Sequence, residues 1–282
     1  MKIGFIGAGK VGYSLGKYFK SKGLTISGYY SRSKVSSEGA ASFTESKSYT
    51  NLDNLINDSS IILITTNDNE INNVWNLINS YKLEDKIIAH CSGSISSKIF
   101  YKSLSNAYFY SIHPMFPFSD KFNSYKGLEK ATFTIEGSEE KLNYLKNLLE
   151  TLGNEVLTIS SENKSLYHLA NVFSSNLYTA LVAKGVKMLN SIGIEETSAI
   201  RALSPLMESN VKNLTQFGPV VGLTGPVERG DSKTIEKHLN ILTSFENKEI
   251  YKLLSKELVS LAAKKNPLKK YESIKSMLEE EI

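Results

Sequence analysis

The sequence predicts an α/β amino-terminal domain, built on a doubly wound and mostly parallel sheet, followed by an all-helical carboxy-terminal domain. Short apolar runs alternate with amphipathic helical patterns through residues 1–160, whereas helical spacing dominates residues 161–282. A glycine-rich turn joins the first apolar run to the first helix. A chain of 282 residues is long enough for two domains. We therefore predict one domain over 1–160 and a second over 161–282.

The glycine-rich turn lies between a predicted strand that begins at Lys2 and a helix that runs to about Lys22. Its residues are Gly7, Ala8, Gly9, Lys10, Val11 and Gly12. In this spacing the first glycine permits a tight turn, the second lets the backbone approach a pyrophosphate, and the third lets the helix pack closely on the strand. The helix N-terminus adds unpaired N–H groups and a positive dipole end. We expect a dinucleotide to bind here; the alternative is a structural turn that binds nothing.

The second predicted strand, 24–30, is followed by Ser31, Arg32 and Ser33. A site that prefers NAD usually has Asp or Glu at this point, where the carboxylate accepts hydrogen bonds from the adenosine ribose. A guanidinium instead suits a phosphate, because its planar donors can bind two oxygens at once. The sequence therefore predicts NADP, with these three residues around the 2′-phosphate. The alternative is an exposed basic turn.

Two more predicted strands, at 60–66 and 86–89, end in polar loops. In a doubly wound sheet, ligands bind outside the carboxyl ends of the strands. We therefore expect these loops to contact the cofactor. The expected contacts are Thr66, Asn67, His90 and Ser92.

Other residues at this edge have two interpretations. Asp68 either joins the site or caps the helix predicted over 68–80. His90 and His113 follow or end predicted strands, the latter after 108–112. An imidazole there can relay a proton. The alternative is that each ring only satisfies the backbone of its own loop.

A strand at 132–136, a helix at 139–152 and a strand at 155–159 complete the first domain, and a long helix is predicted over 162–192. On that helix His168, Asn171 and Ser175 stand at i, i+3 and i+7, with Asn176 beside them. This polar stripe on an otherwise apolar helix predicts the wall of a polar cleft. A hydrated or interhelical hydrogen-bonded face is the alternative.

Further helices are predicted over 195–217, 231–243, 248–264 and 268–280. The loop between the first two contains Glu228 and Arg229, which turn chemistry does not explain, whereas Asp231 suits a helix N-cap. Arg229 could clamp a substrate carboxylate through two parallel hydrogen bonds. The alternative is a rigid turn between helices.

Composition excludes several classes of protein. The 33 basic and 29 acidic residues give a net charge of +4 without a long basic run, so we expect no nucleic-acid partner. Cys91 is the single cysteine, which excludes an intrachain disulfide, and the scattered histidines show no metal-ligand spacing. No apolar stretch reaches about 18 residues, so no membrane span is expected. We expect a cytoplasmic protein.

Together these motifs resemble the Rossmann-like proteins with a C-terminal DUF2520 domain. The residues that carry the resemblance are Gly7–Gly12, Ser31–Ser33, His90–Gly93, His113–Pro114, Tyr167–His168, Ser175–Asn176 and Leu223–Asp231. That family is similar in layout to ketopantoate reductases, pyrroline-5-carboxylate reductases, F420-dependent NADP oxidoreductases and β-hydroxyacid dehydrogenases. The resemblance implies a nucleotide-binding domain, a helical second domain and a homodimer built through the C-terminal helices.

One departure concerns the proton donor. The β-hydroxyacid enzymes use a lysine on the long helix, where this chain offers His168, Asn171 and Asn176; Lys164 lies a turn earlier and Lys184 well beyond. This departure argues against β-hydroxyacid chemistry and leaves the general acid open.

Two functions are consistent with the sequence. The first is an NADP-dependent oxidoreductase that transfers a hydride between NADPH and a carbonyl or imine of a small anionic metabolite. In it His168 donates or relays the proton, Ser175 and Asn176 bind the substrate, and Arg229 holds its anionic group. The second is a non-catalytic NADP sensor whose helical domain docks a partner.

Overall fold

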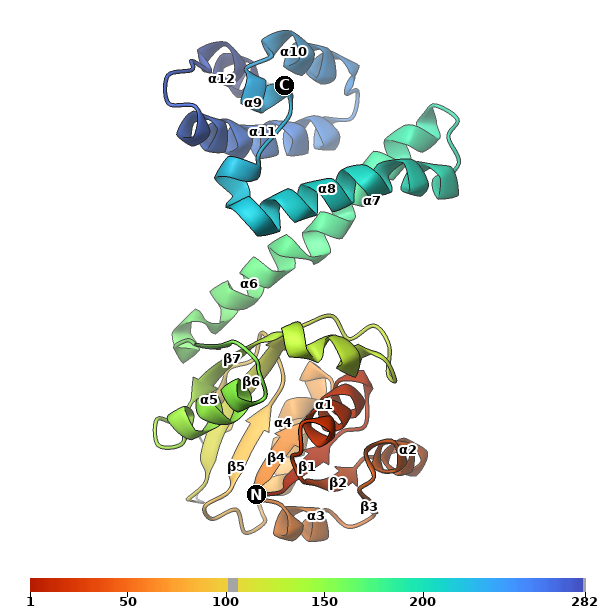
Figure 1. Cartoon of the computed structure of the whole chain (residues 1–282), viewed down its shortest axis with the longest axis vertical. Helices are drawn as coiled ribbons and strands as arrows, with labels where there is room; N and C mark the ends of the chain where they lie inside the picture. The colour runs from red at the N-terminus through yellow and green to blue at the C-terminus, as the bar shows by residue number, and fades with distance from the viewer. Residues whose placement is uncertain (101–105, 281–282) are drawn as a thin grey trace. The chain divides into compact units, whose positions relative to one another are not determined.

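The computed structural model describes residues 1–100 and 106–280. Contacts divide the chain into two compact units, Met1–Thr179 and Ala180–Ile282 (Figure 1). Each unit is described by itself. The division predicted after residue 160 stays a prediction.

The described strands form one eight-stranded sheet in the order β3-β2-β1-β4-β5-β6-β7-β8. The strands are β1 Ile3–Ile6, β2 Ile26–Tyr30, β3 Lys47–Tyr49, β4 Ile61–Ile64, β5 Ile87–His90, β6 Tyr108–Met115, β7 Thr132–Gly137 and β8 Val156–Thr158. All neighbouring pairs are parallel except β6 and β7. The strand order reverses between β1 and β4, which is the switch point where a doubly wound sheet binds its ligand. The predicted fold class is confirmed.

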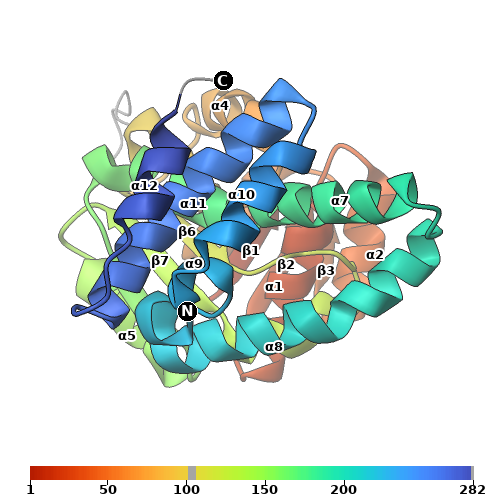
Figure 2. The same ribbon diagram turned by 90° about the horizontal axis from the view of Figure 1, so that it is seen from above.

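Helices cover both faces of this sheet (Figures 1 and 2). They are α1 Lys10–Ser21, α2 Lys34–Thr44, α3 Leu52–Asp58, α4 Asp68–Ile78 and α5 Leu142–Thr151, with 3₁₀ turns η1 Ser97–Phe100, η2 Ser124–Lys130 and η3 Ser161–Asn163. Successive strand residues point to opposite faces, so Phe5 packs in the layer with α1, α2 and α5, and Ile6 packs in the layer with α3 and α4. Burial on both faces explains why these strands are continuously apolar.

Several short elements lie between residues 31 and 60, where the sequence analysis placed none. The N-cap of α2 is Ser33, whose hydroxyl accepts a hydrogen bond from the Ser36 N–H, and the N-cap of α3 is Asn51, whose side chain accepts one from the Asp53 N–H. Strand β3 has only three residues and is the edge of the sheet. Strand β3 and the seven-residue helix α3 carry too few apolar repeats to be recognised by periodicity.

The prediction of a single helix over 162–192 is wrong in one respect. The segment is two helices, α6 Lys164–Ser174 and α7 Asn176–Ser191, with Ser175 non-helical between them at φ −128° and ψ −71°. The hydroxyls of Ser174 and Ser175 donate to the carbonyls of Ala170 and Asn171. Such bonds back to residue i−4 compete with the helical ladder and bend the helix.

The second unit is helical in its described part, as predicted. Its remaining helices are α8 Glu196–Gly222, α9 Pro226–Arg229, α10 Ser232–Ile241, α11 Phe245–Lys265 and α12 Glu272–Glu279. Within α8 the helix is broken at Gly218, with φ 75° and ψ 171°, which matches the predicted end at 217. Ile235, Ile274 and Leu278 form the centre of a small apolar core with α11.

No helix in the described ranges combines the length and the hydropathy that crossing a bilayer requires.

We expect Gly12→Ala to lower the free energy of unfolding by about 1–3 kcal/mol, the usual cost of overpacking. A Cβ at Gly12 would lie 2.6 Å from the Gly7 carbonyl oxygen, so α1 would have to move away from β1. Gly9→Ala is the matched control, because a Cβ there meets no atom within 4 Å. Urea unfolding measures both variants. An equal loss in both would contradict the proposed close packing at Gly12.

Candidate cofactor cleft and polar cluster

The glycine turn has the geometry that a dinucleotide turn requires. Gly7 has φ 111°, and a Cβ there would lie 2.8 Å from the Thr65 carbonyl carbon. The Thr65 hydroxyl donates to the Gly7 carbonyl at 2.9 Å, which ties the turn to the end of β4. Gly9, by contrast, faces open space and is the N-cap of α1 without a side-chain capping bond. The N-terminus of α1 is therefore accessible to an anionic group.

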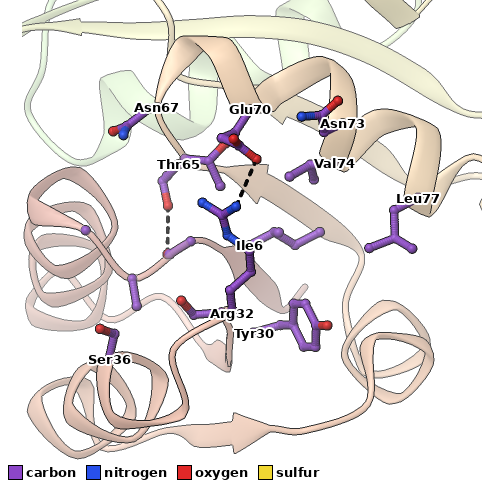
Figure 3. Close-up of a pocket in the computed structure, with 15 residues that line it drawn as sticks. Ile6, Tyr30, Arg32, Ser36, Thr65, Asn67, Glu70, Asn73, Val74 and Leu77 are labelled. Carbon is purple, nitrogen blue, oxygen red and sulfur yellow. Dashed lines mark hydrogen bonds and ion pairs between the residues drawn. The ribbon is translucent and has the colours of Figure 1, made fainter.

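A cleft of about 370 Å³ opens beside this turn (Figure 3). Most of the residues predicted to bind the cofactor are brought together in its lining. They are Gly7, Ala8, Gly9, Ser31, Arg32, Thr66 and Asn67. The turn, the end of β2 and the end of β4 thus meet at the switch point of the sheet.

The cleft also has a wall that sequence reasoning missed. Glu70, Asn73, Val74 and Leu77 of α4 line it at the spacing of one helical face. The Arg32 guanidinium reaches this wall, with its Nη1 3.4 Å from Oε2 of Glu70 (Figure 3). The sequence did contain a signal for this wall: residues spaced three and four apart lie on one face of a helix, and this helix starts at the ligand edge of the sheet.

The other predicted cofactor residues do not line the cleft. They are Lys10, Val11, Gly12, Ser33, His90 and Ser92. Ser33 caps α2, and Gly12 packs against the turn. His90 is fully buried with its ring against Phe100, and burial lowers its pKa to about 4. The polar end of β5 thus lies outside this cleft, and the predicted contact of its residues with the cofactor stays a prediction.

A second polar region lies at the ends of β5 and β6. The hydroxyls of Ser92 and Ser94 both donate to the same oxygen of Asp68, at 2.7 and 3.0 Å. The N-cap of α4 is Asn67, so Asp68 does not cap the helix as one interpretation suggested. Its carboxylate instead holds the loop that contains Gly93.

A buried lysine belongs to the same region, which we call the polar cluster: the polar side chains around Gly93 at the ends of β5 and β6. Lys164, at the start of α6, is 1% exposed, and its Nζ donates to the Ser111 hydroxyl at 2.6 Å. Ser111 in turn donates to the Ser92 carbonyl at 3.1 Å. Burial lowers the pKa of Lys164 to about 8, and within the described residues no carboxylate forms an ion pair with it. The sequence analysis noted this lysine only as lying a turn too early.

Two histidines converge on the loop at Gly93. His113 Nδ1 is hydrogen-bonded to the Tyr167 hydroxyl at 2.7 Å. A Cβ at Gly93 would lie 2.9 Å from both Nε2 of His113 and Cδ2 of His168. Burial, reinforced by the nearby positive charge of Lys164, lowers the pKa of His113 to about 4. The ring of His113 is therefore neutral at pH 7.

The structure brings His168 into this cluster, but not the rest of the predicted polar stripe. Asn171 donates to the Tyr167 carbonyl, and the exposed Ser175 donates to the Asn171 carbonyl and to Oδ1 of the exposed Asn176. The helical rise puts Ser175 about 10 Å along the axis from His168. Ser175 and Asn176 lie at the break between α6 and α7, and their contact with a substrate stays a prediction.

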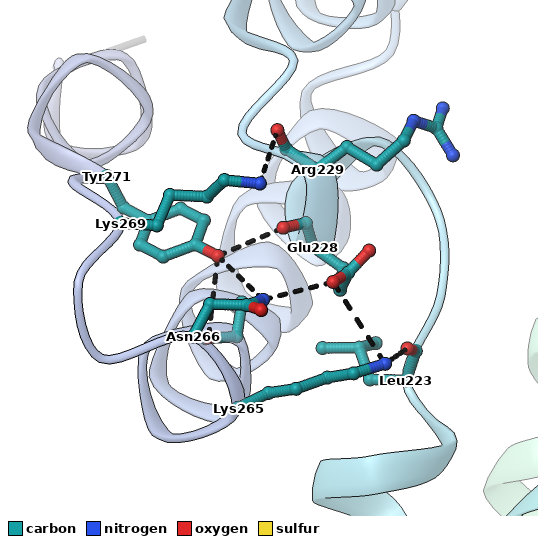
Figure 4. A network of polar contacts seen from close by, with 8 residues as sticks. Leu223, Glu228, Arg229, Lys265, Asn266, Lys269 and Tyr271 are labelled. Carbon is teal, nitrogen blue, oxygen red and sulfur yellow. Dashed lines mark hydrogen bonds and ion pairs between the residues drawn. The ribbon is translucent and has the colours of Figure 1, made fainter.

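Arg229 belongs to the second unit, on α9. Its carbonyl accepts from Lys269, and the neighbouring Glu228 accepts from Asn266 and, through its carbonyl, from Tyr271 (Figure 4). The exposed guanidinium forms no hydrogen bond or ion pair with any described residue. The turn is therefore fixed, while the charged end of Arg229 is left available.

Two family models match the chain. A Rossmann-like domain matches residues 1–114, and the domain of unknown function DUF2520 matches residues 131–258. No curated protein matches the chain.

Several solved structures are similar to this chain over nearly its whole length. A protein of Thermotoga maritima is 26% identical, with a TM-score of 0.77 over 93% of this chain and 98% of its own. A candidate NADP oxidoreductase of Bacteroides fragilis is 25% identical, with a TM-score of 0.71 over 92% of this chain and 98% of its own. The NADP-bound pyrroline carboxylate reductase of Plasmodium falciparum is 12% identical, with a TM-score of 0.59 over 99% and 97%. The predicted resemblance is confirmed.

We expect stability to fall as the pH is lowered from about 6.5 to about 4. His90 and His113 have folded pKa values of about 4 against an ordinary value of 6.5, so in this window the unfolded chain binds more protons than the folded one. Each histidine contributes a slope of up to about 1.4 kcal/mol per pH unit. Urea unfolding at a series of pH values measures the slope. His113→Gln should reduce it and the exposed control His238→Gln should not; equal slopes in all three proteins would refute this origin.

Proposed function

We propose that this chain, which matches a Rossmann-like domain over residues 1–114 and DUF2520 over residues 131–258, is an NADP-dependent oxidoreductase. It transfers a hydride between NADPH and the carbonyl or imine carbon of a small anionic metabolite. The observation that carries the proposal is the accessible glycine turn at Gly9 in one cleft with Arg32. The similarity to an NADP-bound reductase and to a candidate NADP oxidoreductase supports it.

The residues of the cleft fit this cofactor. The open N-terminus of α1 suits the pyrophosphate, and the apolar side chains of Ile6, Val74 and Leu77 suit the adenine face. Arg32 supplies the positive charge for a 2′-phosphate, with Ser31 and Ser33 beside it. When bound, the cofactor supplies the hydride; the chain has to orient it and to provide a proton.

The polar cluster is the part of the first unit suited to proton transfer. We assign the proton donor to His168, whose ring lies next to Gly93, as does the ring of His113. The Tyr167 hydroxyl fixes the orientation of His113 by its bond to Nδ1. The positive charge of Lys164, which donates to Ser111 and forms no ion pair with a carboxylate of the described residues, favours negative charge that develops nearby.

The remaining predicted residues keep secondary roles in the proposal. Ser175 and Asn176 hydrogen-bond a substrate long enough to reach the α6–α7 break. The binding of an anionic group by Arg229, in the second unit, stays a prediction: its guanidinium forms no hydrogen bond or ion pair with any described residue, and its turn is held by Lys269 and Tyr271.

We further propose a homodimer formed through the C-terminal helices. Large apolar side chains are exposed along one side of α8, where a globular monomer normally keeps polar residues. They are Ile200 44%, Leu206 68%, Val211 44%, Leu214 39% and Phe217 51% exposed. A second copy of the chain would cover this stripe, in line with the resemblance.

The function is tested by NADPH oxidation, followed by absorbance, against a panel of keto acids and cyclic imines. We expect turnover with at least one of them, and His168→Ala should lower kcat about 10²- to 10⁴-fold with NADPH binding unchanged, since a general acid contributes that much. His238→Ala, in the second unit, is the matched control. Full activity in His168→Ala would remove that residue as the donor, and NADPH binding without any turnover would favour the sensor.

The dimer is tested by light scattering after gel filtration. We expect a dimer for the wild type and a monomer for Leu206→Glu, because a charge in an apolar interface is costly to desolvate. Leu268→Glu is the control, since Leu268 is 100% exposed outside α8. A monomeric wild type would contradict the proposal.

A further inference from the structure

Glu70 occupies an unexpected place in the cofactor cleft. It lies on the face of α4 that lines the cleft, and its Oε2 is 3.4 Å from Nη1 of Arg32 (Figure 3). The side chain of Glu70 is 31% exposed, whereas that of Arg32 is 83% exposed. Glu70 also lies in the first turn of α4, where the helix dipole favours a carboxylate even without Arg32. The arginine is therefore the partner that can leave.

This ion pair opposes the binding of a 2′-phosphate. For Arg32 to bind the phosphate it must exchange the carboxylate for the phosphate oxygens, and Glu70 then remains close to another anion. A ligand that carries a 2′-hydroxyl in place of the phosphate avoids this repulsion, and its hydroxyl can donate to the carboxylate. Arg32 and Glu70 thus favour different cofactors from opposite walls of one cleft.

We propose that Glu70 is a specificity-determining residue, which competes with the 2′-phosphate for Arg32 and accepts a hydrogen bond from the adenosine ribose when that phosphate is absent. The proposal rests on the proposed function, since it presumes that a nicotinamide dinucleotide binds in this cleft. Its consequence is that the chain prefers NADP over NAD by less than Arg32 alone would produce.

The test compares four proteins: the wild type, Glu70→Gln, Arg32→Gln and the double variant. Dissociation constants are measured by calorimetry at one fixed ionic strength for NADPH and NADH. Adenosine 2′,5′-bisphosphate and 5′-AMP are used in parallel, because they report on the adenosine end alone. Glu150→Gln is the matched control, since Glu150 pairs with Lys146 at 3.7 Å on α5, outside the cleft.

We expect Glu70→Gln to tighten NADPH and the bisphosphate about two- to fivefold, the scale of one exposed ion pair, and to weaken NADH and 5′-AMP. In the Arg32→Gln background the gain for NADPH should shrink, because the competition acts through Arg32. Glu150→Gln should change nothing.

Equal effects of Glu70→Gln on phosphorylated and unphosphorylated ligands, or no effect, would overturn the inference and leave the proposed function standing. So would an unchanged gain in the Arg32→Gln background. If the wild type binds none of the four ligands, the proposed function fails and the inference fails with it.

Discussion

The close approach of α1 to the ends of β1 and β4 is the constraint on which the rest of the first unit depends. Gly7 and Gly12 leave no space for a Cβ, and the Thr65 hydroxyl closes the contact by donating to the Gly7 carbonyl. Because α1 is held there, its N-terminus lies at the switch point of the sheet and Gly9 faces open space. The cleft is the consequence of this packing: the turn forms its floor, and the end of β2 and one face of α4 form its walls.

The first unit keeps two polar regions with different character. The cleft contains an ion pair between the exposed Arg32 and the partly exposed Glu70, and such surface pairs contribute little to stability. The cluster around Gly93 contains a buried lysine whose Nζ donates to the Ser111 hydroxyl and lies over the Tyr167 ring, and a partly buried histidine bound to the Tyr167 hydroxyl. Burying titratable groups costs stability, and groups whose pKa is shifted in this way are concentrated at functional sites. The arrangement is consistent with one region that binds a cofactor and another that moves protons.

In the second unit, polar contacts are concentrated around α9, whereas α8 has an apolar surface. Around α9, Lys269, Asn266 and Tyr271 hold the backbone and carboxylate of the turn, and the Arg229 guanidinium forms no hydrogen bond or ion pair with any described residue (Figure 4). Along α8, by contrast, large apolar side chains remain exposed. A free guanidinium can bind an anion, and an exposed apolar surface can bind a partner, so both features are available for interactions beyond the unit.

The sequence by itself determined the fold class and the position of the glycine turn, since continuous apolar strands and the Gly7, Gly9 and Gly12 spacing are local patterns. It also located seven of the fifteen residues that line the cleft, because strand ends of a doubly wound sheet share one edge. Tertiary structure decided which polar side chains at that edge meet. The buried His90 ring packs against Phe100, whereas Lys164 donates a hydrogen bond to Ser111, which lies 53 residues away in the sequence. Local sequence does not encode such encounters, because they depend on how distant elements pack against one another.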